Sequence, residues 1–108
     1  MFKITESAAA QIKLSKEKLG EATLRLRISA RFAPEHGIAY KMGFDDVYDT
    51  DITLEINNIE IIYDKDSEKL IKGMVIDYRE LNGEMQIVFE NPNDMNPENM
   101  ANNSFSDR

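Results

Sequence analysis

The sequence contains no cysteine and only one histidine among its 108 residues. A chain without cysteine forms no disulfide, offers no thiolate to a metal ion and has no cysteine nucleophile. It also shows neither a Ser-His-acid arrangement nor a nucleophile-elbow motif, so we predict no catalytic residues and do not expect an enzyme. The missing cysteine excludes more chemistry than any motif in the chain supplies.

Long apolar runs and an excess of basic residues are missing too. No stretch of about 18 apolar residues is present, so the sequence predicts no membrane span. Residues 1–6 lack the basic start and apolar core of a secretory signal, and we expect a cytoplasmic protein. With 13 basic and 20 acidic residues the net charge is −7, which repels phosphate backbones and anionic lipids, so nucleic acid and membranes are not expected partners.

The composition is that of one globular domain followed by a tail. With 108 residues, 42% of them hydrophobic, the chain can bury roughly 65% of the surface that its unfolded form exposes. Asparagine occurs six times in residues 91–108, and the few apolar side chains there cannot offset the entropy of ordering this segment. We therefore predict a folded domain over residues 1–93 and a flexible, Asn-rich tail over residues 94–108.

Two segments carry the signals of a helix. Thr5 is suited to cap the first, since its hydroxyl can accept hydrogen bonds from backbone N–H groups of the first turn, and Gly20 is suited to end it. The second is a shorter helix within residues 64–73, with Asp66 or Ser67 as the expected N-cap.

Elsewhere apolar and polar residues alternate with a period of two, which is typical of half-buried β-strands. Asn57-Asn58 and Asn82-Gly83 supply the left-handed backbone conformations that two-residue hairpin turns need. The sequence predicts an α+β fold that leans towards all-β: a mixed, mostly antiparallel β-sandwich or barrel of about seven short strands, with one N-terminal helix and one short helix before the last hairpin. The predicted strands lie within residues 2–4, 24–29, 38–44, 52–56, 59–63, 74–79 and 85–89.

Two groups of charged residues lie in and after the first predicted hairpin. Arg25 and Arg27 are candidates for an anion site, but two solvated arginines near acidic neighbours are the simpler interpretation in so acidic a chain. Residues 45–51 include four aspartates, which suit calcium, but the segment lacks the central glycine and the ligand spacing of an EF-hand. Aspartates that cap their own turn explain this segment with fewer assumptions.

Four motifs occur in a specific order along the chain. The sequence reads LRLRI at 24–28, GIAYKMGFDD at 37–46, VIDY at 75–78 and FENPN at 89–93. In this combination the chain resembles the HesB/IscA family, the A-type carriers of iron–sulphur cluster biogenesis, over residues 3–93. The resemblance implies the family's fold and a relation to cluster biogenesis, with protein partners in the iron–sulphur assembly system and a homodimer as one expected assembly.

The resemblance also locates three positions at which the family carries cysteine. They fall on Glu35 in the first hairpin turn and on Asn99 and Ala101 in the tail. Family members are thought to hold iron or a cluster through these thiolates, and none of the three residues here offers sulphur. The resemblance therefore implies a scaffold without the family's cluster ligands: a non-enzymatic protein in an accessory or interaction role, with no cofactor.

One alternative concerns the same turn. Glu35 and His36 supply a carboxylate and an imidazole, which suit iron(II), manganese or zinc. Two adjacent ligands make a partial site, so a second subunit or the Asp45-Asp46 pair would have to complete it. The alternative hypothesis is a divalent-metal (iron) binding protein, and the competing interpretation is a solvent-exposed turn without a ligand.

Overall fold

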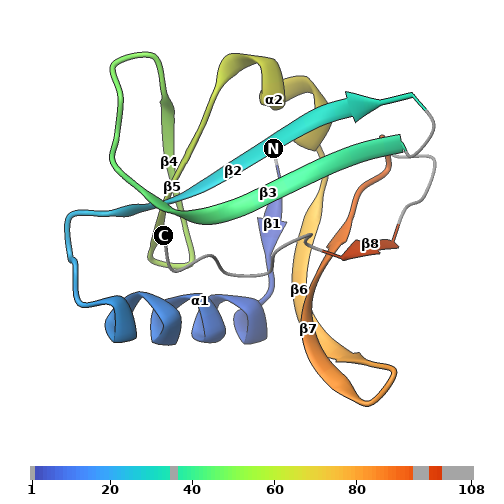
Figure 1. Cartoon of the computed structure of the whole chain (residues 1–108), viewed down its shortest axis with the longest axis horizontal. Helices are drawn as coiled ribbons and strands as arrows, with labels where there is room; N and C mark the ends of the chain where they lie inside the picture. Colours follow the sequence, from blue (N-terminus) through green and yellow to red (C-terminus); the bar gives the residue numbers. More distant parts are fainter. Residues whose placement is uncertain (1, 35–36, 94–97, 101–108) are drawn as a thin grey trace.

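The computed structural model describes residues 2–34, 37–93 and 98–100, the last three through their backbone alone. This part of the chain forms two four-stranded sheets and two helices (Figure 1). In chain order the elements are β1 (Lys3–Ile4), α1 (Glu6–Leu19), β2 (Arg25–Ala33), β3 (Gly37–Asp45), β4 (Ile52–Ile56), β5 (Ile59–Tyr63), α2 (Lys65–Ile71), β6 (Val75–Leu81), β7 (Glu84–Glu90) and β8 (Glu98–Met100).

Each sheet joins antiparallel hairpins through one parallel pair. The first sheet has the order β3-β2-β5-β4, with β2 parallel to β5, and the second has the order β1-β6-β7-β8, with β1 parallel to β6. The mixed, mostly antiparallel α+β fold predicted from the sequence is thus confirmed. Over the described ranges the two sheets stay separate and do not close into a barrel, so that architecture is excluded there.

The seven predicted strands correspond to β1–β7. An eighth, β8, was not predicted: three residues are too few to show an alternating pattern, and β8 is defined by its antiparallel pairing with β7. It lies in the segment expected to be flexible, but residues 94–97 and 101–108 lie outside the described part of the chain. Flexibility of the tail therefore stays a prediction.

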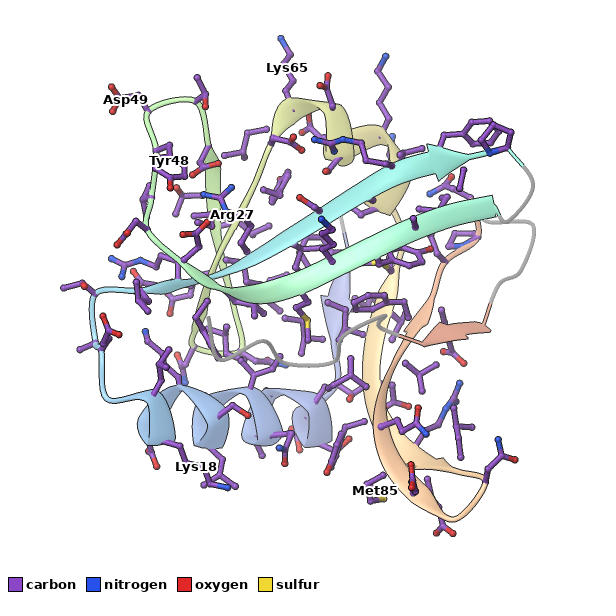
Figure 2. The ribbon with its side chains drawn as sticks, viewed as in Figure 1. Lys18, Arg27, Tyr48, Asp49, Lys65 and Met85 are labelled. Atoms are coloured by element: carbon purple, nitrogen blue, oxygen red, sulfur yellow. The ribbon has the colours of Figure 1, made fainter. Side chains whose placement is uncertain are left out.

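Both helices begin at a capping side chain. The backbone N–H of Ala8 donates to Thr5 Oγ1 at 3.2 Å, and Gly20 ends α1 with φ +77°, both as predicted. In Figure 2 Lys18 lies on the outer side of α1. The expected cap of α2, Asp66 or Ser67, is wrong, because Asp64 Oδ1 already accepts from the backbone N–H of Ser67 at 3.0 Å and the helix begins at Lys65. Neither helix is long and apolar enough to cross a membrane.

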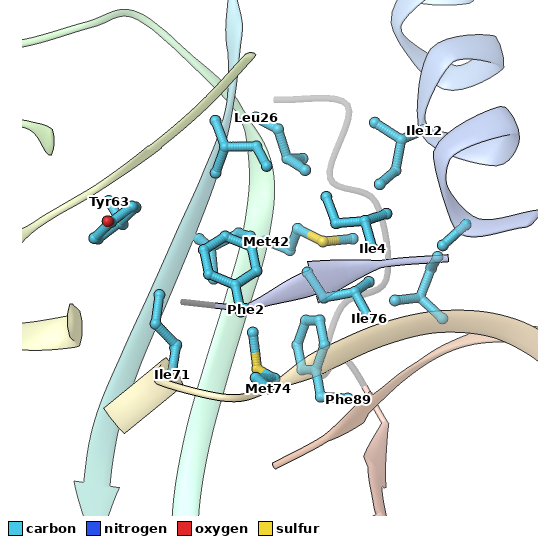
Figure 3. Close-up of a cluster of buried hydrophobic side chains, with 14 of the residues drawn as sticks. Phe2, Ile4, Ile12, Leu26, Met42, Tyr63, Ile71, Met74, Ile76 and Phe89 are labelled. Atoms are coloured by element: carbon cyan, nitrogen blue, oxygen red, sulfur yellow. The ribbon is translucent and has the colours of Figure 1, made fainter. Parts of the chain in front are cut away.

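Apolar side chains from both sheets and from α1 form one core (Figure 3). The alternating residues of β2 and β3 give the hairpin one buried face, as predicted, and α1 packs against β5 and β6. Because so much of the hairpin face is removed from water, the position of the hairpin depends on the core. Fully buried members of the core include Ile12, Leu26, Ile28, Tyr40, Ile61, Met74, Ile76 and Phe89.

Candidate functional site

The β2–β3 hairpin carries the turn on which two of the predicted ligands lie. Its strands pair over nine residues each, ending with Ala33 opposite Gly37. Phe32 belongs to the face of β2 that buries Ile28 and Ala30, yet its side chain is 66% exposed, so this end of the hairpin extends beyond the core. Residues 35 and 36, and hence the predicted metal ligands Glu35 and His36, lie outside the described residues. Their role stays a prediction.

Strand β8 is linked to this hairpin through β7, which contacts β3. Asn99 lies in β8, opposite Phe89 of β7, and the other tail position, Ala101, lies outside the described residues. The ring of Phe89 packs against the ring of Tyr40 in β3, with 4.6 Å between the centroids. Tyr40 is only three residues from Gly37, so β8 and the turn end of the hairpin belong to the same end of the molecule (Figure 1).

Two asparagines after β7 hold this end together. Asn91 is buried, and its Nδ2 donates to Tyr40 Oη at 3.0 Å and to the Leu70 carbonyl oxygen at 2.6 Å. Asn93 Nδ2 donates to the Lys72 carbonyl oxygen at 2.7 Å. These bonds satisfy carbonyl groups at the C-terminal end of α2 that no helical N–H can reach. The sequence analysis found the FENPN motif but did not predict this role.

The Asp45-Asp46 pair lies far from the turn that it was expected to complete. Gly37 and Asp45 are the first and last residues of β3, and at about 3.3 Å per residue a nine-residue strand separates its ends by roughly 26 Å. The proposal that this pair completes a site with Glu35 and His36 is therefore wrong within one chain. The strand predicted over residues 38–44 already implied this separation between the turn and Asp45.

The aspartates around residues 45–51 are instead organised by Arg27. Its Nε donates to Asp45 Oδ2 at 2.8 Å, and Nη1 and Nη2 donate to the two carboxylate oxygens of Asp51 at 2.7 Å each. The guanidinium also lies over the ring of Tyr48, 5.1 Å from its centroid, and Figure 2 shows these two side chains together at the β3–β4 loop. Arg27 is thus neither a solvated arginine nor an anion site, because its guanidinium already donates to carboxylates of the same chain.

The hydrogen bonds from Arg27 have a clear electrostatic effect. They hold the pKa of the Asp51 carboxyl below its ordinary value, and the carboxylates raise the pKa of Arg27 in turn. Asp51 Oδ2 also accepts from the backbone N–H of Tyr48 at 2.7 Å, and Asp45 Oδ1 accepts from that of Asp46 at 2.8 Å. The interpretation that these aspartates cap their own turn is confirmed, with Arg27 as the partner that the sequence did not reveal.

A second buried polar group joins α2 to β2. The hydroxyl of Ser67, which is 0% exposed, accepts from the backbone N–H of Ala30 at 2.9 Å and lies 3.3 Å from its carbonyl oxygen. Next to it, Arg31 Nη2 donates to Asp64 Oδ2 at 2.6 Å, which holds the pKa of Asp64 at about 2. Strand β2 pairs with β5 only at Leu26 and Arg27. Farther along β2, the Ser67 hydroxyl makes the hydrogen bonds to the Ala30 backbone that a neighbouring strand would otherwise make.

The hydrogen bonds of Arg27, Ser67 and Asn91 therefore hold elements of the fold together. Across residues 2–34 and 37–93, no three His, Asp or Glu side chains gather where they could hold a metal ion. A cluster ligated by soft sulphur does not fit the donor set of this chain, since oxygen and nitrogen are the only donors available at the three family positions.

The family model and the relatives that match this sequence agree with one another. A family model described as iron-sulphur cluster biosynthesis matches residues 1–97. A putative iron-sulfur cluster insertion protein ErpA of Cupriavidus metallidurans is 37% identical over 94 residues, covering 85% of this chain and 76% of that protein. The iron-sulfur cluster insertion protein ErpA 2 of Methylococcus capsulatus is 33% identical over 93 residues, covering 85% and 72%.

Solved structures share the fold. The crystal structure of IscA with a 2Fe–2S cluster matches with a TM-score of 0.67 at 21% identity, covering 86% of each chain. Escherichia coli SufA, described as involved in biosynthesis of iron-sulfur clusters, matches with a TM-score of 0.67 at 16% identity, covering 85% of this chain and 86% of that one. At these identities the structural matches establish the architecture alone.

Proposed function

The chain belongs to the HesB/IscA family of iron–sulphur cluster biosynthesis proteins, and on that basis we propose that it is a non-enzymatic accessory or interaction protein of cluster biogenesis in the cytoplasm, working without a cluster of its own. Its partners would be proteins of the iron–sulphur assembly system. The relation to cluster biogenesis is supported by the relatives, which are named as cluster insertion proteins. The lack of a cluster is supported by the sequence, which contains no cysteine.

The observation that carries the proposal is the absence of cysteine from a chain that keeps the family's fold. The positions that correspond to the family's cysteines hold Glu35, Asn99 and Ala101, which are a carboxylate, an amide and a methyl group. Cluster iron is held in proteins mainly by thiolates, with imidazole as a rarer substitute, and this chain has a single histidine. A second copy of the chain would add a second histidine and still no thiolate.

Anaerobic reconstitution with iron(II) and sulphide tests the lack of a cluster. We expect the purified chain to stay colourless after desalting, while an ErpA relative treated in parallel develops a stable visible chromophore. A triple variant with Glu35→Cys, Asn99→Cys and Ala101→Cys should gain part of that absorbance. A stoichiometric, stable chromophore in the unmodified chain would contradict the proposal.

The accessory role has its own measurement. Cluster transfer from an ErpA relative to an apo acceptor protein is followed with and without the cysteine-free chain. We expect the transfer rate to change with added chain and to saturate at a fixed ratio, since a specific partner binds with defined stoichiometry. A rate that does not respond at any ratio would argue for a function outside cluster transfer.

A second proposal is binding of a divalent metal, such as iron(II), by Glu35 and His36. It is favoured by the adjacency of a carboxylate and the only imidazole in the hairpin turn, and because Asp45 and Asp46 are excluded within one chain, the remaining ligands would come from a second copy. Calorimetric titration with iron(II) should show saturable binding that His36→Ala removes. An isotherm that is unchanged in the variant rejects this site.

A further inference from the structure

A pocket of about 280 Å³ lies between α2, the end of β5 and residue 2 of the chain. Its floor consists of three buried side chains, Phe2, Tyr63 and Ile71. Its rim consists of three exposed charged side chains of α2 and its C-terminal cap, Glu68, Lys69 and Lys72. Figure 3 shows Tyr63 and Ile71 at one margin of the core. An apolar floor with a few polar groups, at a size close to the lower limit of about 300 Å³ for small-molecule sites, fits a small ligand.

The floor of the pocket carries one polar side-chain group, the hydroxyl of Tyr63. This side chain is only 4% exposed, because it follows Ile59 and Ile61 on the core face of β5. The Phe2 ring packs against it, with 6.1 Å between the centroids. Buried tyrosine hydroxyls usually have a hydrogen-bond partner, but within the described part of the chain Tyr63 Oη has none. Burial and the Glu68 carboxylate raise the pKa of this hydroxyl, so it keeps its proton at neutral pH and can donate to a ligand.

The charges on the rim are not neutralised by one another. Glu68 and Lys72 are four residues apart with the carboxylate on the N-terminal side, which is the order that favours an ion pair on a helix. Among the residues that the structure describes, however, neither these two side chains nor Lys69 form a salt bridge. A molecule in the pocket can therefore contact one carboxylate and two ammonium groups.

We propose that this pocket binds a free α-amino acid with an apolar side chain. The ligand carboxylate pairs with Lys69 and Lys72 and accepts a hydrogen bond from the Tyr63 hydroxyl. Its ammonium group pairs with Glu68, and its side chain packs on the apolar floor. Every polar side chain that lines the pocket then has a partner.

The charges on the rim select a zwitterion over ligands with a single charge. An apolar amine places its ammonium group beside two lysines, and an apolar acid places its carboxylate beside Glu68 with no cation of its own to offset the repulsion. An α-amino acid carries both charges on one carbon atom, so it can meet both kinds of rim group at once. A residue within a peptide chain carries neither charge on its backbone.

Titration with L-leucine and L-phenylalanine, followed by ¹⁵N–¹H correlation spectra, tests the ligand class. We expect saturable shifts of the amide signals of residues 63 and 68–72. The matched probes for leucine are 4-methylpentanoate, which lacks the ammonium group, and 3-methylbutylamine, which lacks the carboxylate. Each should bind about tenfold more weakly, since one charge-assisted pair is lost. The inference is overturned if neither amino acid gives saturable shifts at tens of millimolar, or if 4-methylpentanoate binds as tightly as leucine.

Variants of the lining residues test the site. Tyr63→Phe removes a hydroxyl that has no partner within the described part of the fold, so it should leave thermal unfolding unchanged and weaken leucine binding about fivefold. Glu68→Gln should weaken leucine binding about tenfold and tighten the binding of 4-methylpentanoate, because it removes the repulsion between two carboxylates. If leucine binds to both variants as it does to the unmodified chain, the inference is wrong.

Lys69→Gln and Lys65→Gln form a matched pair, because both lysines belong to α2 and only Lys69 lines the pocket. Figure 2 shows the Lys65 side chain pointing away from the molecule. Only Lys69→Gln should weaken leucine binding, by about fivefold. Equal effects of the two variants would show a general response to net charge and overturn the inference. These measurements need neither iron nor a partner protein, so their outcome is independent of the proposed function.

Discussion

The side-chain amide of Asn91 donates a hydrogen bond to the hydroxyl of Tyr40 at 3.0 Å, although the two residues are 51 positions apart. The same nitrogen donates to the Leu70 carbonyl oxygen. One buried side chain thus ties together the hairpin, the end of α2 and the segment that leads to β8. Replacement of Asn91 should loosen the end of the molecule that contains Gly37 and β8.

We expect Asn91→Ala to lower the free energy of unfolding by about 2 kcal/mol, since it removes the buried amide that donates to both the Tyr40 hydroxyl and the Leu70 carbonyl and leaves that carbonyl only the longer bond from Asn93. Urea unfolding measures the loss. Tyr40→Phe is the matched control, because it removes the hydroxyl alone, and the double variant gives the coupling between the two residues. Additive losses would show that the Asn91–Tyr40 bond contributes nothing of its own.

Arg27→Met should cost about 3 kcal/mol, because the Asp51 side chain is only 2% exposed and would lose its cationic partner. Arg27→Lys should recover only part of this, since one ammonium cannot match both carboxylates. Denaturant unfolding at neutral pH provides the values. In the double variant Arg27→Met, Asp51→Asn the buried carboxylate is gone and only the partly exposed Asp45 has lost Arg27, so a double variant as unstable as Arg27→Met would contradict this account.

Ser67→Ala should destabilise the fold by about 2 kcal/mol, because it leaves the buried backbone N–H of Ala30 without its acceptor. Ser7→Ala is the matched control: the Ser7 hydroxyl also makes hydrogen bonds, but it is exposed, so water can replace them and the cost should stay within about 0.5 kcal/mol. Hydrogen exchange at Ala30 adds a local measurement. Equal losses for the two variants would mean that burial of Ser67 is not the cause.

The Asp64 carboxyl predicts a pH dependence. Its pKa is held at about 2 by Arg31, below an ordinary value near 3.9, so its contribution is complete above about pH 4 and is lost as the pH falls towards 2. Asp64→Asn keeps an N-cap acceptor and loses only the charge. Since Arg31 is exposed, we expect a cost of about 0.5 kcal/mol at pH 7 that vanishes near pH 2.

Asp64→Ala separates the cap from the charge. It should cost about 1 kcal/mol more than Asp64→Asn at neutral pH, because the N–H of Ser67 loses its acceptor. Thermal unfolding between acidic and neutral pH measures both variants. A difference between wild type and Asp64→Asn that does not change with pH would rule out the Arg31 pair as its source.

Local signals were sufficient for most of the fold. Thr5 and Gly20 bound α1 because their effect is confined to one helical turn, and Asn57-Asn58 and Asn82-Gly83 form hairpins because positive φ is a property of the residues themselves. The cap of α2 was missed because three candidate side chains lie within four residues of one another. The choice of Asp64 depends on Ser67 being buried against β2, which is a tertiary contact.

The roles of the polar residues were harder to predict for the same reason. Arg27 and Asp51 are 24 residues apart, and Asn91 and Tyr40 are 51 apart, so no local sequence pattern predicts either pair. The candidate ligand positions came from motif resemblance alone.

The parallel pairing of β1 with β6 has a consequence for synthesis of the chain. Lys3 pairs with Val75, so β1 leaves the ribosome well before β6, the strand with which it pairs. Contacts between residues so distant in sequence form slowly, because a long loop must close first. Strand β1 is therefore made well before it can reach its final place beside β6.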